Sequence, residues 1–122
     1  MALILVVDDE FSVAEVLASV LTDAGHEVIT AINGRQGLER LDERPPDLVL
    51  LDFVMPIMDG PTMLRIMRQN PSHSAIPAII MSSLPESTIV QSSKGFYAAF
   101  LRKPFKLRAV LDVVNNLVNR QG

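Results

Sequence analysis

The stretch LILVVDD at residues 3–9 decides the fold of this chain. Its first five residues form a continuous apolar run rich in β-branched side chains, and Asp8 and Asp9 end that run abruptly. Such a run is typical of a strand buried on both faces, because a half-exposed strand would alternate apolar and polar side chains. Strands of this kind belong to parallel sheets that helices cover on both sides, so the stretch predicts an α/β fold.

The same order of elements repeats along the rest of the chain. Over residues 12–24 the apolar side chains recur at three- and four-residue spacing, and Gly25 follows as a stop, which predicts an amphipathic helix. We expect further strands at 26–31, 48–51, 75–81 and 97–101, and further helices at 35–43, 63–68, 85–93 and 107–118. Five strand-helix units predict a doubly wound (βα)5 fold with right-handed crossovers, in one domain over residues 1–122.

Composition excludes several classes of protein. The formal charge of −3 and the scattered Lys and Arg residues argue against direct nucleic-acid binding, which needs clustered basic side chains. The absence of cysteine excludes disulfides, thiolate zinc sites and a cysteine nucleophile. The first seven residues lack the basic start of a signal peptide, and no apolar run is long enough to cross a bilayer. We therefore expect a cytoplasmic protein without membrane contact.

Polar side chains follow the predicted strands, and the carboxyl ends of parallel strands meet at one edge of a sheet. Asp8 and Asp9 follow the first strand, Asp52 the third, Ser82 the fourth and Lys103 the fifth. Taken singly, each has an ordinary structural explanation, such as capping a helix, ending a turn or facing solvent. Together, three carboxylates at one edge repel one another unless a cation neutralises them.

The chemistry of these groups favours Mg²⁺ as that cation. Carboxylate and carbonyl oxygens are hard ligands, and the chain has no Cys and no suitably placed His for zinc. Lys103 would add a positive charge, and Ser82 a hydroxyl donor, for the oxygens of a phosphoryl group.

Residues 52–60, DFVMPIMDG, match the pattern D-x-x-M-P-x-M-D-G at every specified position. With the two acids after the first strand, Ser82, and Lys103-Pro104, this stretch resembles the receiver domain of two-component response regulators. The resemblance covers the whole chain, points to a single-domain, chemotaxis-regulator-like member, and leaves nothing over for an output domain. It implies a flavodoxin-like strand order of 2-1-3-4-5 and a cis bond between Lys103 and Pro104.

The resemblance also implies a role for each site residue. Asp52 would be the phosphoacceptor, and Asp9 and Asp52 would bind Mg²⁺ directly. Asp8 would act mainly through bound water, and the backbone carbonyl of Val54 would be a third protein ligand. Lys103 would pair with the phosphate.

The implied activity is that of a phosphorylation-dependent switch rather than an enzyme, since such a domain catalyses only its own phosphorylation and dephosphorylation. Its donor would be a sensor histidine kinase or a histidine phosphotransfer protein. Ser82 and Phe100 would transmit the change to the face formed by the last two helices and the fifth strand, which a downstream protein or an output domain would contact. We expect a monomer or a weak phosphorylation-dependent dimer.

Two positions depart from the commonest pattern of the family. Phe100 stands where many relatives carry Tyr, so a hydrogen bond through its hydroxyl is absent. Val54 is apolar where several relatives place a polar side chain that helps to orient the attacking water, which predicts a long-lived phosphoryl group. Phe11, with Val13 or Ala14, is a candidate docking patch for the phosphodonor.

Other side chains are expected to have structural roles. We predict that five methionines pack in the core and loops rather than bind a soft metal, namely Met55, Met58, Met63, Met67 and Met81. His26 and His73 have no ligand spacing, and we predict exposed structural positions for both.

Two functions of other classes remain as alternatives. A Mg²⁺-dependent phosphohydrolase could use Asp52 as its nucleophile, but such enzymes typically place a second Asp two residues later, where this chain has Val54. A module that only binds partners, without phosphorylation, would not need the full set of acids, hydroxyl and Lys. Flavin binding is disfavoured because Asp8, Asp9 and Glu10 follow the first strand and would repel phosphate.

Overall fold

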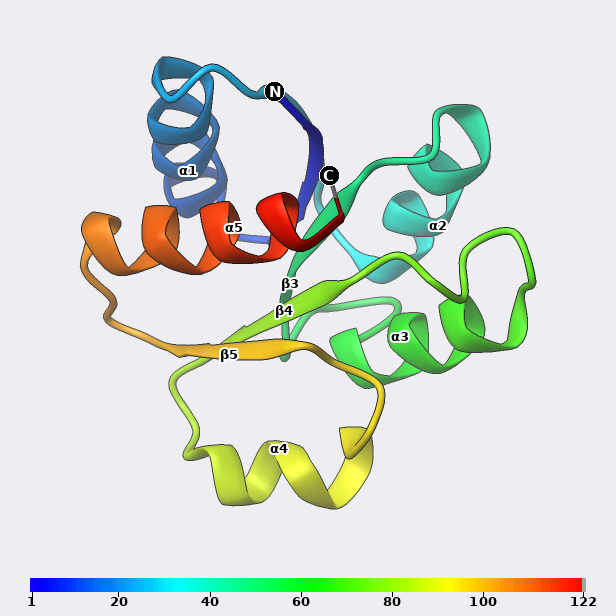
Figure 1. Cartoon of the computed structure of the whole chain (residues 1–122). Coiled ribbons are helices and arrows are strands. Elements are labelled where there is room, and N and C mark those ends of the chain that lie inside the picture. The colour runs from blue at the N-terminus through cyan, green and yellow to red at the C-terminus, as the bar shows by residue number, and fades with distance from the viewer. Residues whose placement is uncertain (122) are drawn as a thin grey trace.

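The computed structural model describes residues 1–121, in which five strands and five helices alternate (Figure 1). The strands are β1 (Leu3–Val7), β2 (Glu27–Ala31), β3 (Leu48–Asp52), β4 (Ala78–Ser82) and β5 (Ala99–Arg102). The helices are α1 (Phe11–Asp23), α2 (Gly34–Glu43), α3 (Gly60–Gln69), α4 (Glu86–Ser93) and α5 (Leu107–Gln121). The predicted alternation of strands and helices is confirmed.

The strands form one parallel sheet in the order β2-β1-β3-β4-β5, as the resemblance implied. Helices α1 and α5 cover one face of the sheet, and α2, α3 and α4 cover the other (Figure 1). The strand order reverses between β1 and β3, which is where sheets of this class bind their ligands.

Each central strand contributes side chains to two hydrophobic cores. In β3, Leu48 and Leu50 pack in the core beneath α1 and α5, whereas Val49 and Leu51 pack in the core beneath the other three helices. Full burial of an aliphatic side chain contributes about 1.5–3 kcal/mol, so the central strands tolerate no polar position before they end. This is why their sequences are continuous apolar runs.

Most element boundaries differ from those predicted by one to three residues, and three of them have a visible structural reason. Helix α3 begins at Gly60 because the Asp59 side chain caps it, accepting a hydrogen bond from the Thr62 amide at 2.9 Å, and Pro61 is tolerated in the first turn. Strand β4 begins only at Ala78, after Pro77, which has no amide hydrogen to donate. Strand β5 extends to Arg102, which pairs with Ser82 at the end of β4.

The prediction that both histidines are exposed was wrong. His26 is buried and its Nδ1 accepts a hydrogen bond from the Ala2 amide at 3.2 Å. His73 is also buried, and its Nε2 lies 3.7 Å from a carboxylate oxygen of Asp42. The small and polar residues next to them in the sequence suggested that both rings are exposed to solvent. The segments that enclose the rings come from elsewhere in the chain.

The five methionines between residues 55 and 81 follow the prediction. The side chains of Met55, Met63, Met67 and Met81 are buried in the two cores, and Met58 packs against one of them.

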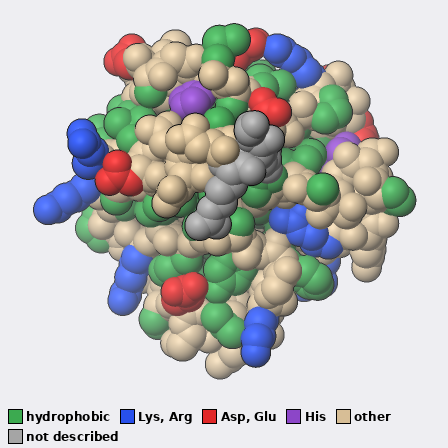
Figure 2. Space-filling view, in the orientation of Figure 1, with side chains coloured by type: hydrophobic (Ala, Val, Ile, Leu, Met, Phe, Trp, Pro, Cys, Tyr) green, Lys and Arg blue, Asp and Glu red, His purple; other side chains and the backbone are tan. Residues whose placement is uncertain are grey.

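The surface adds two observations. On the face drawn in Figure 2, the Lys and Arg side chains stand apart from one another and are interspersed with acidic and uncharged ones. Among residues 1–121, no helix has both the length and the apolar character that crossing a bilayer requires.

Candidate functional site

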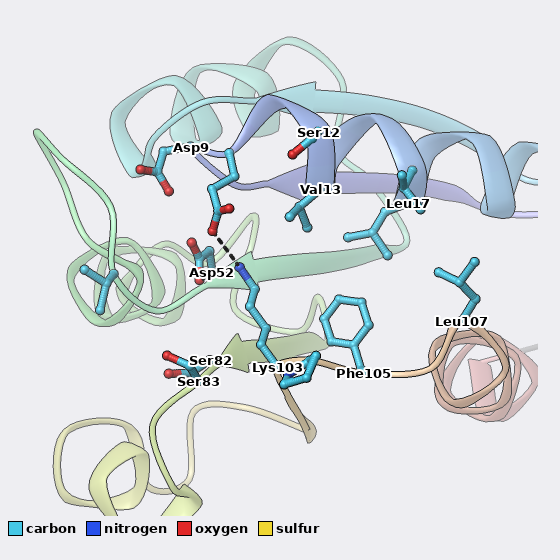
Figure 3. A pocket seen from close by; sticks show the side chains of 14 residues that line it. Asp9, Ser12, Val13, Leu17, Asp52, Ser82, Ser83, Lys103, Phe105 and Leu107 are labelled. Carbon is cyan, nitrogen blue, oxygen red and sulfur yellow. Dashed lines mark ion pairs between the residues drawn. The ribbon is translucent and has the colours of Figure 1, made fainter.

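Three carboxylates meet at the carboxyl edge of the sheet. Asp8 and Asp9 follow β1, and Asp52 ends the adjacent strand β3, where Val7 pairs with Leu51. One carboxylate oxygen from each of the three acids lies within 4.8 Å of the others. Figure 3 shows two of these acids, Asp9 and Asp52, with Lys103 beside them. The parallel pairing of β1 with β3 therefore brings Asp52 close to Asp8 and Asp9, although Asp9 precedes it by 43 residues in the sequence.

Lys103 reaches into this acidic cluster from the end of β5. Its Nζ donates a hydrogen bond to Asp8 Oδ2 at 3.0 Å and lies 3.4 Å from Asp52 Oδ1. The carboxylate of Glu10, which is outside the cluster of three acids, lies 3.7 Å from the same Nζ. The Lys103–Pro104 bond is cis, as the resemblance implied. The ammonium thus bridges the ends of two strands.

Burial and charge shift the proton affinities of these groups. Burial, reinforced by the negative charge of Asp8, raises the pKa of Asp52 to about 7, although the Lys103 ammonium partly opposes the shift. Burial lowers the pKa of Lys103, but its hydrogen bond to Asp8 and the charges of Asp52 and Asp8 outweigh that effect and leave the pKa raised. One ammonium does not balance the carboxylates around it.

The donor set fits a magnesium ion. Three carboxylates within reach of one another offer hard oxygen ligands and an excess of negative charge that a divalent cation relieves.

The surroundings of the three acids differ. Asp8 is fully buried, and its two oxygens accept hydrogen bonds from the Glu10 amide at 2.9 Å and from Lys103. Asp9 is exposed and Asp52 is buried at the floor of the site.

The acidic cluster opens into a cavity of about 750 Å³. One part of the lining is polar and includes Asp9, Asp52, Ser82 and Lys103. The other part is apolar and comes from α1 and from the segment that leads into α5: Val13, Val16, Leu17, Phe105 and Leu107. A phosphoryl group at Asp52 would therefore lie at one end of a partly apolar groove.

The switch candidates lie on β4 and β5. Ser82 is buried, and its Oγ accepts a hydrogen bond from the Leu84 amide at 3.0 Å, so the hydroxyl oxygen is held by the loop after β4. Phe100 is half-buried and packs against the core beneath α4. Of the two residues, Ser82 lines the cavity, and Phe100 lies in the core on the side of the sheet that α4 covers.

The loop after β3 carries two further features of the site. Val54 lines the cavity with a side chain that is 64% exposed, which leaves an apolar group at its mouth. Gly60 lies against the end of β3, because a Cβ added there would stand 2.4 Å from the backbone oxygen of Asp52. The sequence pattern contained Gly60, but this backbone approach, which positions the loop, emerges only from the tertiary structure.

The predicted docking patch is only partly present at the surface. Phe11 is 75% exposed at the start of α1, and Val13 lines the cavity. Ala14 is buried in the core, which corrects the prediction that placed it in the patch. Its position one residue after Val13 turns its side chain towards the sheet, where it packs with Leu17 and Leu21.

Comparison with known sequences agrees with this geometry. Residues 4–115 match the family model of the response regulator receiver domain. The chain is 34% identical over 118 residues to the chemotaxis protein CheY of Bacillus subtilis, covering 95% of this chain and 97% of that protein. It is 36% identical over 112 residues to the sporulation initiation phosphotransferase F of the same organism, covering 91% and 89%.

Comparison with solved structures gives the same result. The receiver domain of the Francisella response regulator 1452 superposes with a TM-score of 0.91 at 26% identity, covering 100% of both chains. The chemotaxis response regulator CheY4 of Vibrio cholerae superposes with a TM-score of 0.90 at 28% identity, covering 96% of this chain and 98% of that one. The similarity in sequence and in structure thus extends over nearly all of the chain.

Proposed function

The chain belongs to the response regulator receiver domain family, and from that premise we propose that it is a phosphorylation-dependent switch whose Asp52 accepts a phosphoryl group. The observation that carries the proposal is the meeting of the acidic cluster with Lys103 at the edge of the sheet. Asp52 is at the floor of the cavity, within 3.4 Å of the ammonium that would accompany the phosphoryl oxygens.

The proposed metal is Mg²⁺, held directly by the carboxylates of Asp9 and Asp52 and the backbone carbonyl of Val54. Asp8 contributes mainly through water, which accords with the two hydrogen bonds that already occupy its oxygens. When bound, the ion supplies positive charge that offsets the carboxylates and the transferring phosphoryl group.

The proposed reaction is in-line transfer from a phosphohistidine of a sensor kinase or a phosphotransfer protein. A carboxylate oxygen of Asp52 forms a bond to phosphorus, the bond from phosphorus to the imidazole nitrogen breaks, and its electron pair leaves with the imidazole. Lys103 stabilises negative charge on the oxygens of the group in flight. Hydrolysis of the resulting acyl phosphate returns Asp52 to its carboxylate form.

The proposed readout begins with the charge of the new group, roughly −1.5 to −2, and its three acceptor oxygens. These oxygens accept a hydrogen bond from the Ser82 hydroxyl, which turns towards them and gives up the hydrogen bond that it accepts from the Leu84 amide as the loop moves. The loop motion favours a more buried Phe100 and alters the face formed by α4, β5 and α5 for a downstream partner. Any dimer formed through that face would be weak and would depend on phosphorylation.

The proposal is tested by incubating the protein with a small phosphodonor and Mg²⁺ and measuring its intact mass. We expect one phosphate adduct on the wild type and none on Asp52→Asn. Asp59→Asn is the matched control, because Asp59 lies in the same loop outside the acidic cluster and Asn also caps a helix. An equal adduct on Asp52→Asn, or none on the wild type, would contradict the proposal.

A further inference from the structure

Strand β2 forms one edge of the sheet, so one side of its backbone has no partner strand among the described residues. The other side faces β1, because the Glu27 amide donates a hydrogen bond to the Ala2 carbonyl at 2.9 Å. The backbone groups of successive residues point to opposite sides of a strand. The amides and carbonyls of Val28 and Thr30 therefore face the free edge of β2.

The sequence of β2 does not protect this edge. Three β-branched residues follow one another at 28–30, and such residues favour strand pairing. Proteins commonly prevent pairing at an edge with a Lys or Pro in the strand or with a bulge. Strand β2 contains neither residue, and its register with β1 is unbroken from Glu27 to Ala31. Protection must therefore come from another element.

Two arginines reach the edge of β2 from α2. Arg40, in the last turn of the helix, donates a hydrogen bond from its Nε to the Thr30 carbonyl at 3.3 Å. Its Nη1 also pairs with Glu43 at 3.2 Å, which holds the guanidinium in this position. Arg44, the residue that ends the helix, donates two hydrogen bonds to the Glu27 carboxylate, one of them at 2.8 Å. We call Arg40 and Arg44 the edge arginines.

We propose that the edge arginines keep the free edge of β2 from pairing with the same edge of a second copy of this chain. Two copies related by a two-fold axis would pair their β2 strands antiparallel and continue the sheet from one copy into the other. That pairing uses the Thr30 carbonyl, which Arg40 occupies. Strand β5 lies at the opposite edge of the sheet, so this contact is distinct from the phosphorylation-dependent dimer described above and goes beyond the proposed function.

The test compares the wild type with Arg40→Ala/Arg44→Ala by sedimentation equilibrium at micromolar to millimolar protein, without a phosphodonor. We expect the double variant to self-associate about tenfold more tightly than the wild type, because the Thr30 carbonyl of each copy becomes free to accept a hydrogen bond. Arg35→Ala/Arg65→Ala is the matched control. It removes the same charge from exposed positions on α2 and α3, and it should associate no more than the wild type.

Hydrogen exchange at single amides locates the contact. Association of the double variant should slow exchange at Val28 and Thr30, whose amides face the free edge. Adding Thr30→Pro should restore the monomer, because Pro has no amide hydrogen and is tolerated in edge strands. Four results would overturn the inference: a double variant as monomeric as the wild type, equal association of the control, association without slower exchange at these two amides, or association that persists in a folded triple variant.

Discussion

The carboxylate of Asp52, the proposed phosphoacceptor, is unfavourable to keep charged in the free domain. It is buried, it faces the charge of Asp8, and it shares one ammonium with that neighbour. The same features that raise its pKa to about 7 favour any ligand that brings positive charge. At the scale of single residues, the surroundings of Asp52 therefore favour binding of a cation, but they reduce the free energy of unfolding when no cation is bound.

Because the folded state disfavours a charged Asp52, we expect the free energy of unfolding to depend on pH. The substitution Asp52→Asn should abolish this dependence. The folded pKa of about 7 lies above the unfolded value of about 3.9, so between these pH values the folded state binds the extra proton. Stability of the wild type should fall as pH rises through this window and stay low above it. In EDTA, Asp52→Asn should be more stable on the order of 2 kcal/mol at pH 8 and near parity at pH 4. Urea unfolding at the two pH values measures this, and a gap that does not change with pH would refute it.

The side chain of Val54 leads to a separate prediction, about the lifetime of the acyl phosphate. Its side chain lines the cavity mouth and has no polar group to orient a water molecule for attack on phosphorus. Val54→Asn should shorten the half-life by about fivefold, since an amide can position that water. The measurement is release of inorganic phosphate from the isolated phosphoprotein. Val54→Leu is the apolar control, and an unchanged half-life in Val54→Asn would exclude this role.

At the scale of elements, Arg68 joins α3 to the two segments that flank β4 and β5. Its guanidinium donates to the carbonyls of Phe96 at 2.9 Å and Ile76 at 2.8 Å, and to those of His73 and Ser74 at longer distance. Burial lowers the pKa of Arg68. The guanidinium nevertheless donates hydrogen bonds to four backbone carbonyls. This side chain therefore joins two loops whose apolar residues, Ile76 and Phe96, are only partly buried against the core.

Arg68→Ala should therefore lower the free energy of unfolding by about 2–3 kcal/mol, because buried or half-buried carbonyls would lose a charged donor. Urea unfolding checks the value. Arg65→Ala, on the exposed side of the same helix, should change it by less than about 0.5 kcal/mol. Equal effects of the two variants would show that helix propensity, and not the hydrogen bonds, is responsible.

At the scale of the whole molecule, binding of a cation at one edge of the sheet should stabilise the entire domain. The acids come from β1 and β3, which are central in the sheet and pack in both cores, so the site exists only when the domain is folded. A ligand that binds only the folded state raises its stability by mass action.

Millimolar Mg²⁺ should accordingly raise the Tm of the wild type, and Asp9→Asn should lose most of that increase. Glu10→Gln removes the same charge from the next residue, outside the cluster of three acids, and should keep it. Thermal unfolding followed by circular dichroism, with and without Mg²⁺, makes the comparison. Loss of the increase in both variants would mean that total charge, rather than the proposed ligands, determines binding.

Much of the fold and part of the site were predictable because they depend on local patterns. The apolar runs predicted the five strands, their alternation with amphipathic segments predicted a parallel sheet, and the stretch at 52–60 placed Asp52 at a strand end. Such features depend on the spacing of residue types along the chain, and full burial of the central strands enforces them. A strand covered on two faces allows few other sequences.

Only the tertiary structure decided the features that depend on contacts between distant segments. Lys103 bonds to Asp8 across 95 positions of the chain, and burial with that neighbour sets the pKa of Asp52. The burial of His73 and Ala14 and the strained backbone of the exposed Ile57, whose φ angle is 69°, were likewise invisible in the residue pattern. The burial of a residue, the electrostatic potential at its side chain and its backbone strain all depend on the atoms packed around it, including those of distant segments. The sequence by itself therefore determined which groups meet at the edge of the sheet, and the folded chain determined the state in which they meet.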